Sequence, residues 1–196
     1  MNVKAWRAAL PSVDGVRPPH CPNCGCASRI AGERLALHGH GVRSRQQRGP
    51  HAPGERPEIT DVSLRRYRCT RCSAVCAVGP GDVVPRYLYS GPAIAWALGL
   101  FGLLNMTVCR VRRLVAPWQR VGASAHGRWT TLRRWLRAIA HGQLFRNPAL
   151  GDTPGARQLA ARLASVIAAQ APPEHGLRPR HDRAFFGAPA YLLATV

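Results

Sequence analysis

Residues 67–72 read YRCTRC, and a similar piece, HCPNCGC, occupies residues 20–26. Each contains a Cys-x-x-Cys pair, whose two thiolates converge on one metal ion because the backbone between them curls around it. Two such pairs supply the four tetrahedral ligands of a structural zinc site. We therefore predict that a zinc ion joins two distant parts of the chain, with Cys21, Cys24, Cys69 and Cys72 as its ligands.

Other ligand sets stay open at this point. The gap between Cys24 and Cys69 is longer than in most zinc sites, although the entropy of closing a loop rises only slowly with loop length. The residues that can replace one of the four thiols are Cys26, Cys76, His20, His38 and His40. Buried cysteines without any metal are the alternative to a zinc site.

The residues between the two pairs alternate between apolar and polar side chains, as strands do. This alternation occurs in ERLALHGHGVR at 33–43 and in ITDVSLRRYRC at 59–69. The stretch between them is rich in proline and arginine, which predicts a long basic loop over about 43–57. We expect an N-terminal arm over 1–19 and a β zinc ribbon over 20–86.

The charge of the chain indicates a polyanionic partner. The formal net charge is +19, with 28 basic residues against nine acidic ones, and Lys4 is the only lysine. Such a balance is typical of nucleic-acid binding. A GC-rich genome would explain arginine in place of lysine but not the shortage of acids. The N-terminus has no long apolar stretch of a secretory signal, so we expect a cytoplasmic protein associated with the nucleoid.

Residues 87–109 carry no charge at all. Their densely apolar part, 92–104, is shorter than the roughly 20 residues that span a bilayer, and Ser90 followed by Pro92 is typical of a helix start. We therefore predict a buried core helix, with Cys109 also in the core. Insertion into a membrane is the alternative, since basic residues flank the segment.

A shorter helix is expected over 107–115, followed by an amphipathic helix over 127–141 that contains RWTTLRRWLRAIAH. One face of this second helix is apolar, comprising Trp129, Leu132, Trp135, Leu136 and Ile139. The opposite face comprises Thr130, Arg133, Arg134, Arg137 and His141. No carboxylate occurs between residues 83 and 150, whereas ordinary solvated faces mix both signs of charge. We predict that this face contacts DNA; a solvated face without a partner is the alternative.

The predicted fold class is α+β, with the β ribbon followed by a mainly helical part. We expect a helix-turn-helix-like domain over 87–146, an additional helix within 147–171, and an irregular apolar tail over 172–196. No nucleophile elbow, phosphate-binding loop or paired-carboxylate motif is present, so neither an enzymatic activity nor a small-molecule substrate is expected.

The order of these parts resembles the N-terminal zinc-ribbon and helix-turn-helix region of bacterial insertion-sequence transposases. The resemblance covers about residues 21–140 and is carried by the CPxCG knuckle, the RRYRCxxC strand and the TLRRWL segment. It implies that ribbon and helices bind the terminal DNA of a transposon. The catalytic domain of that family would follow, but only Asp152, Glu174 and Asp182 are acidic beyond the helices. We therefore expect a non-catalytic DNA-binding module, with a separately encoded transposase as a further candidate partner.

The residues predicted to contact double-stranded DNA come from three segments. They are Arg43, Arg45 and Arg48 in the loop, Arg65, Arg66 and Arg68 in the strand, and Arg128, Thr130, Arg133, Arg134, Arg137 and His141 in the helix. Two other functions remain open: an RNA- or ribosome-associated ribbon protein that uses the basic loop, and a small membrane-associated protein that uses residues 87–109.

Overall fold

The structure is a computed structural model that describes residues 3–118, 129–146 and 155–194. It confirms the α+β class, with a three-stranded sheet and helices. The chain divides into two compact units: unit 1 consists of Met1–Gln47 and Thr60–Gly81, and unit 2 of Arg48–Ile59 and Asp82–Val196. These units do not follow the predicted boundaries at residues 20, 87 and 147, because the tip of the strand hairpin belongs to the helical unit.

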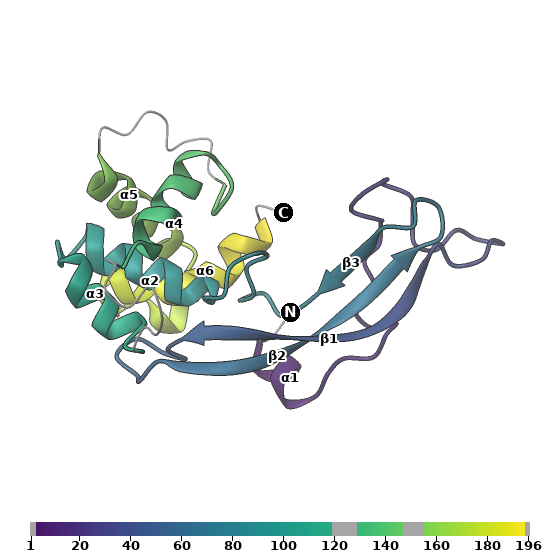
Figure 1. Ribbon diagram of the computed structural model, residues 1–196, viewed down its shortest axis with the longest axis horizontal. Coiled ribbons are helices and arrows are strands. Elements are labelled where there is room, and N and C mark those ends of the chain that lie inside the picture. The colour runs from purple at the N-terminus through teal and green to yellow at the C-terminus, as the bar shows by residue number, and fades with distance from the viewer. Residues whose placement is uncertain (1–2, 119–128, 147–154, 195–196) are drawn as a thin grey trace. The chain divides into compact units, whose positions relative to one another are not determined.

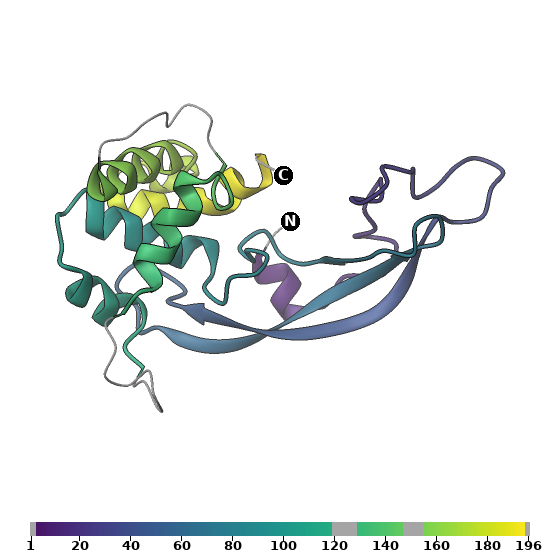
Figure 2. The same ribbon diagram turned by 45° about the horizontal axis from the view of Figure 1, so that its top comes forward.

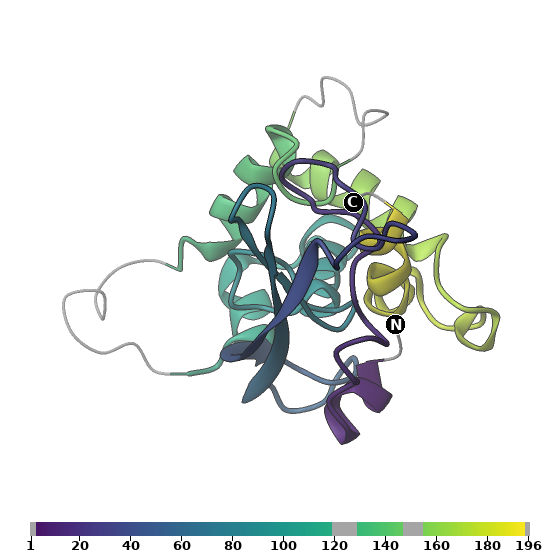
Figure 3. The ribbon, with the colours of Figure 1, turned by 90° about the vertical axis from the view of Figure 1, so that its right-hand side faces the viewer.

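The sheet consists of two long strands and one short one. Its strands are β1 (Leu37–Gly49), β2 (Glu58–Cys69) and β3 (Val75–Val78), in the order β1-β2-β3. The two long strands form a twisted hairpin (Figures 1 and 3). The third strand pairs antiparallel with β2, so that Tyr67 lies opposite Cys76.

The N-terminal residues pack on β2 and do not form a separate arm. They begin with α1 (Val3–Ala8), whose Trp6 is buried and donates from its indole nitrogen to the carbonyl of Ser63 at 2.8 Å. The hydroxyl of Tyr67 donates to the carbonyl of Val13 at 2.6 Å. Trp6 and Val16, which lie within the predicted arm over 1–19, are therefore part of the core of unit 1.

The predicted basic loop over 43–57 is shorter in the structure, because β1 continues to Gly49. The end of the strand is held by backbone hydrogen bonds from Arg48 N to Leu88 O (2.8 Å) and from Ser90 N to Arg48 O (3.1 Å). Pro50 has no N–H to continue the ladder. Arg43, Arg45 and Arg48 thus lie on a strand, and residues 50–57 alone form the loop.

Unit 2 is built on helices, which Figure 2 shows packed together. Their bounds are α2 (Gly91–Gly102), α3 (Val108–Val115), α4 (Thr131–Ala140), α5 (Ala156–Ala168), the short 3-10 helix η3 (Pro173–His175) and α6 (Arg180–Ala194). The prediction of an irregular tail over 172–196 is wrong, since α6 buries Ala184, Phe185, Ala188 and Tyr191.

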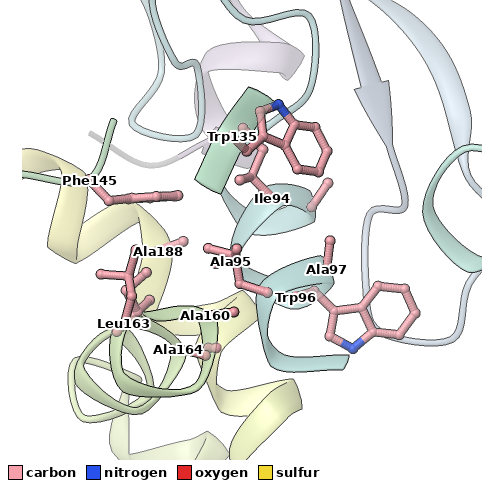
Figure 4. Packing of buried hydrophobic residues seen from close by; sticks show 14 of the residues in the cluster. Ile94, Ala95, Trp96, Ala97, Trp135, Phe145, Ala160, Leu163, Ala164 and Ala188 are labelled. Carbon is pink, nitrogen blue, oxygen red and sulfur yellow. The ribbon is translucent and has the colours of Figure 1, made fainter. Parts of the chain in front are cut away.

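The core of unit 2 surrounds α2. This confirms the prediction that the uncharged segment contains a buried core helix. Eleven of the residues of α2 are buried, and Figure 4 shows Ile94 and Ala95 among residues of α4, α5 and α6. The hydroxyl of Ser90 caps the helix by accepting from Ala93 N at 3.2 Å. None of the helices in the described part of the chain is long and apolar enough to cross a membrane.

Cys109 lies on the exposed side of α3, so the prediction that it belongs to the core is wrong. The buried residues of this helix are Val111 and Val115, which are one turn apart. A residue two positions before Val111 points away from that face. The predicted helix itself is confirmed, with Thr107 as its N-cap.

Candidate metal centre and arginine-bearing helices

The structure brings together the four cysteines predicted as ligands. The sulfur atoms of Cys21, Cys24, Cys69 and Cys72 all lie within 4.8 Å of one another, close enough to hold one metal ion. The Sγ atoms of Cys21 and Cys72 are 3.7 Å apart, and those of Cys24 and Cys69 are 3.8 Å apart. In a regular tetrahedron with metal–sulfur bonds of about 2.3 Å, the sulfurs are about 3.8 Å apart. The thiols therefore fit a tetrahedral thiolate site.

The first turn folds around the site through hydrogen bonds of its own backbone. Gly25 N donates to Cys21 O at 2.9 Å, and Cys21 N donates to Cys26 O at 2.8 Å. Gly25 has φ +71°, which glycine adopts without strain. In the second turn, which has no glycine, Ser73 adopts φ 59°.

The thiols differ in acidity before any metal binds. The backbone amides of Cys72 and, to a smaller extent, Arg71 hydrogen-bond to the Cys69 sulfur and lower its pKa to about 6. The amide of Ala74 and the side chain of Asn23 lower the pKa of Cys72. The second turn thus favours thiolates, the form that coordinates a metal.

Cys24 has the opposite tendency. The amide of Cys26 lowers its pKa, but hydrogen bonding with the Cys26 thiol, burial and the neighbouring thiols together raise the pKa to about 12. The neighbouring thiols thus disfavour a negative charge on Cys24 when no cation is present. A bound metal ion would supply that cation and deprotonate its thiol ligands.

The alternative ligands lie outside this group. Among the described residues, the four-sulfur group does not include Cys26, Cys76, or the histidines at 20, 38 and 40. His38 and His40 are exposed on β1, and Cys76 lies on β3. Cys26 is the nearest candidate, because its Sγ is 3.6 Å from that of Cys69.

The two faces of α4 are separated as the sequence predicts. Leu132, Trp135, Leu136 and Ile139 are buried, whereas the arginines at 133, 134 and 137 are exposed. Thr130 and His141, which flank the helix, are exposed as well, and Arg128 lies outside the described residues. The ring of Trp135 packs edge-on against Tyr89 at 5.0 Å and against Trp129 at 5.8 Å between centroids.

A second helix presents arginines that the sequence reasoning did not select. Arg110 and Arg113 are exposed on α3, while Arg112 is half-buried and donates to Trp118 O at 3.2 Å. The short segment between α2 and α3 turns at Asn105, which has φ 53°. The signal that could have identified this face is the pattern VCRVRRLV, in which Val111 and Val115 recur at helical spacing and the arginines lie at other positions.

The two arginine-bearing helices border one surface hollow. It has a volume of about 580 Å³ and is lined by Phe101, Val108, Leu132, Arg133, Leu136, Arg137, Ala140, Gly155, Ala156 and Leu159. Val108 begins α3, and the residues from 132 to 140 belong to α4. The arginines that line this hollow are thus Arg133 and Arg137 of α4, whereas α3 contributes Val108.

The arginines predicted for the ribbon differ in exposure. Arg43 and Arg68 are exposed, and those half-buried are Arg45, Arg48, Arg65 and Arg66. The Nε of Arg65 donates to the carbonyl of Pro11 at 2.8 Å, which ties this side chain to the N-terminal segment. The arginines predicted to contact DNA thus vary in exposure in the ribbon, whereas Arg133, Arg134 and Arg137 of α4 are all exposed.

No protein-family model, curated protein or solved structure shows significant similarity to this chain.

Proposed function

We propose that this chain is a DNA-binding protein without catalytic activity, whose arginine-bearing helices contact the duplex and whose ribbon is stabilised by zinc. The resemblance to transposase N-terminal regions favours an origin in a mobile element, with a separately encoded transposase as a candidate partner. The exposed arginine face of α4 is the observation that carries the proposal.

The choice of zinc follows from the donor set. Four thiolates in a tetrahedral arrangement are typical of structural zinc sites, in which all coordination positions are filled by protein. Cys21 and Cys69 are buried, which suits a site that supports folding and takes no substrate. Zinc held there would join the turn at residues 21–24 to the end of β2 at Cys69.

Both the charge and the packing of α4 favour DNA as the partner. The apolar face of α4 is buried in unit 2, so the helix has a fixed orientation with Arg133, Arg134 and Arg137 toward the solvent. The sequence from 83 to 150 has no carboxylate to pair with them. Arginine forms bidentate hydrogen bonds with phosphate and with guanine, so a rigid row of arginines suits a nucleic-acid groove.

The arrangement of α2 and α3 supports the same function. In a helix-turn-helix, two helices joined by a short turn are oriented so that the second enters the major groove. The core helix α2 is followed after a short turn by α3, which presents Arg110 and Arg113. We therefore include these two residues among the proposed contacts.

The test compares arginine variants on a preferred duplex that is first selected from a random pool. For Arg133→Ala and Arg137→Ala we expect an unchanged melting temperature, because both side chains are exposed, and weaker binding. A base-reading arginine costs about 1–3 kcal/mol on the preferred site and much less on random DNA, whereas a phosphate contact weakens both alike. Arg110→Ala and Arg113→Ala measure the contribution of α3 in the same way.

Arg162→Ala is the matched control, since it removes the same charge from an exposed position on α5. Its effect on the selected site should be smaller than that of the α4 variants. If all four variants in α3 and α4 bind as tightly as the parent, the helices are not the contact. The proposed contact through the helices is then wrong, and the exposed arginines of the ribbon become the candidate contacts.

A further inference from the structure

A fifth thiol lies beside the candidate metal centre. The Sγ of Cys26 is 3.6 Å from that of Cys69, which is shorter than the distances of 3.7 and 3.8 Å between ligands of opposite turns. Cys26 is nevertheless outside the group of four sulfurs that lie within 4.8 Å of one another. A tetrahedral zinc ion bound by those four has no position for it. The Cys26 thiol therefore stays uncoordinated next to a ligand.

The two sulfurs differ in access. Cys69 is buried, with 1% of its surface exposed, and its thiolate is covered by the surrounding turns. Cys26 is half-buried, so a small solute can reach its thiol from solution. An oxidised Cys26 would then be within reach of a nucleophilic sulfur, because disulfide exchange and sulfenic-acid condensation need only the approach of one thiolate to the other sulfur.

We propose that Cys26 is an oxidative modification site through which hydroperoxides release the metal. In the first step, the Cys26 thiol reacts with hydrogen peroxide to give a sulfenic acid and water. In the second step, the Cys69 thiolate attacks the Cys26 sulfur, the S–S bond forms and hydroxide leaves. Together the two thiols are oxidised by two electrons and the peroxide is reduced to water and hydroxide. The disulfide would leave only Cys21, Cys24 and Cys72 as thiolate donors, which would weaken the hold on a zinc ion and allow its release.

This inference rests on the proposed zinc centre and not on DNA binding. It gives the ribbon a reversible state, since a thiol reductant and zinc restore the original site. Cys26→Ser should bind zinc normally, because serine replaces a thiol that is not a ligand.

The experiment treats the zinc-loaded chain with hydrogen peroxide, follows released zinc with a chromogenic chelator and maps disulfides by mass spectrometry. We expect a Cys26–Cys69 cross-link that accumulates together with the released zinc. Cys26→Ser should lose this cross-link and release zinc more slowly. Cys76→Ser is the matched control, since Cys76 is also half-buried near the centre, and it should behave as the parent. Cys26→Ala serves as a second variant if serine disturbs the turn.

Three results would overturn the proposal. The first is zinc release from Cys26→Ser and Cys26→Ala as fast as from the parent. The second is a cross-link that joins Cys21 to Cys72 or Cys24 to Cys69 instead. The third is loss of zinc from both variants before any oxidation, which would make Cys26 a ligand. A parent protein isolated without zinc contradicts the zinc centre itself, and the peptide map still shows whether Cys26 and Cys69 become linked.

Discussion

Replacing Cys69 with serine should remove the bound zinc and unfold unit 1. The core cluster of this unit is small: it consists of Trp6, Val16, Cys21, Leu37, Tyr67 and Cys69, and two of these are candidate metal ligands. A core of this size stabilises a domain only marginally without a metal or a cross-link. Structural zinc contributes on the order of 10 kcal/mol in small zinc-binding peptides. The free energy lost with the metal should therefore exceed the free energy of unfolding that packing alone provides, so unit 1 should unfold.

Zinc content is measured by elemental analysis, and folding by hydrogen exchange of the amides of β2. The parent should contain one zinc per chain and slow exchange in this strand, while Cys69→Ser should contain none and exchange rapidly. Cys109→Ser is the control, because Cys109 is exposed on α3 in the other unit. A Cys69→Ser protein that lacks zinc but keeps slow exchange in β2 would show that the metal does not hold the ribbon together.

Trp135→Ala should be the most damaging single change among the helices of the proposed DNA-binding region. The side chain of Trp135 is buried, with 2% exposed, and packs edge-on against Tyr89 and Trp129. Removing the ring loses its transfer free energy and leaves a cavity, which together cost about 3–5 kcal/mol of the free energy of unfolding. Loss of DNA binding should follow from loss of the fold.

Thermal or denaturant unfolding of unit 2 measures this effect, with Arg134→Ala as the control. Arg134 is adjacent in sequence but exposed, so its removal should leave the stability nearly unchanged. Equal stability losses in the two variants would contradict the assignment of one buried and one solvent-facing side to α4.

The elements that the sequence predicts well have strong local signals. The buried helix at residues 91–102 has a capping serine and a proline in its first turn, and α4 has a clear helical period. The Cys-x-x-Cys motif is a local signal, so the four cysteines that lie together in the structure could be selected from seven. The resemblance to transposases, in contrast, stays a prediction.

The elements that the sequence reasoning missed depend on contacts between distant residues. Helix α6 contains Pro189 and Gly187, which are typical of irregular segments. The glycine is required by packing, because a Cβ there would lie 2.0 Å from the carbonyl oxygen of Ile167 on α5. Strand β3, with only four residues, is too short for an alternating pattern. The packing of Trp6 on β2 likewise has no local signal.

The exposure of the arginines was also only partly predictable. Helical periodicity placed Arg133 and Arg137 correctly on the outer face of α4. No such rule predicted that Arg65 would donate to the carbonyl of Pro11, 54 residues earlier in the chain. Arg48 was expected in a loop, but the pairing of its backbone with residues 88 and 90 extends the strand and half-buries the side chain.

Competition binding tests the central claim most directly. The zinc-loaded protein is bound to a labelled duplex carrying its selected site, at physiological salt, and challenged with unlabelled duplex DNA or with structured RNA of the same length and charge. Charge alone would make the two competitors equal, because both offer a dense row of phosphates. If α3 and α4 enter a DNA groove, the unlabelled duplex should displace the label at much lower concentration than the RNA. Displacement by RNA at equal or lower concentration would contradict DNA binding and favour an RNA partner for the ribbon.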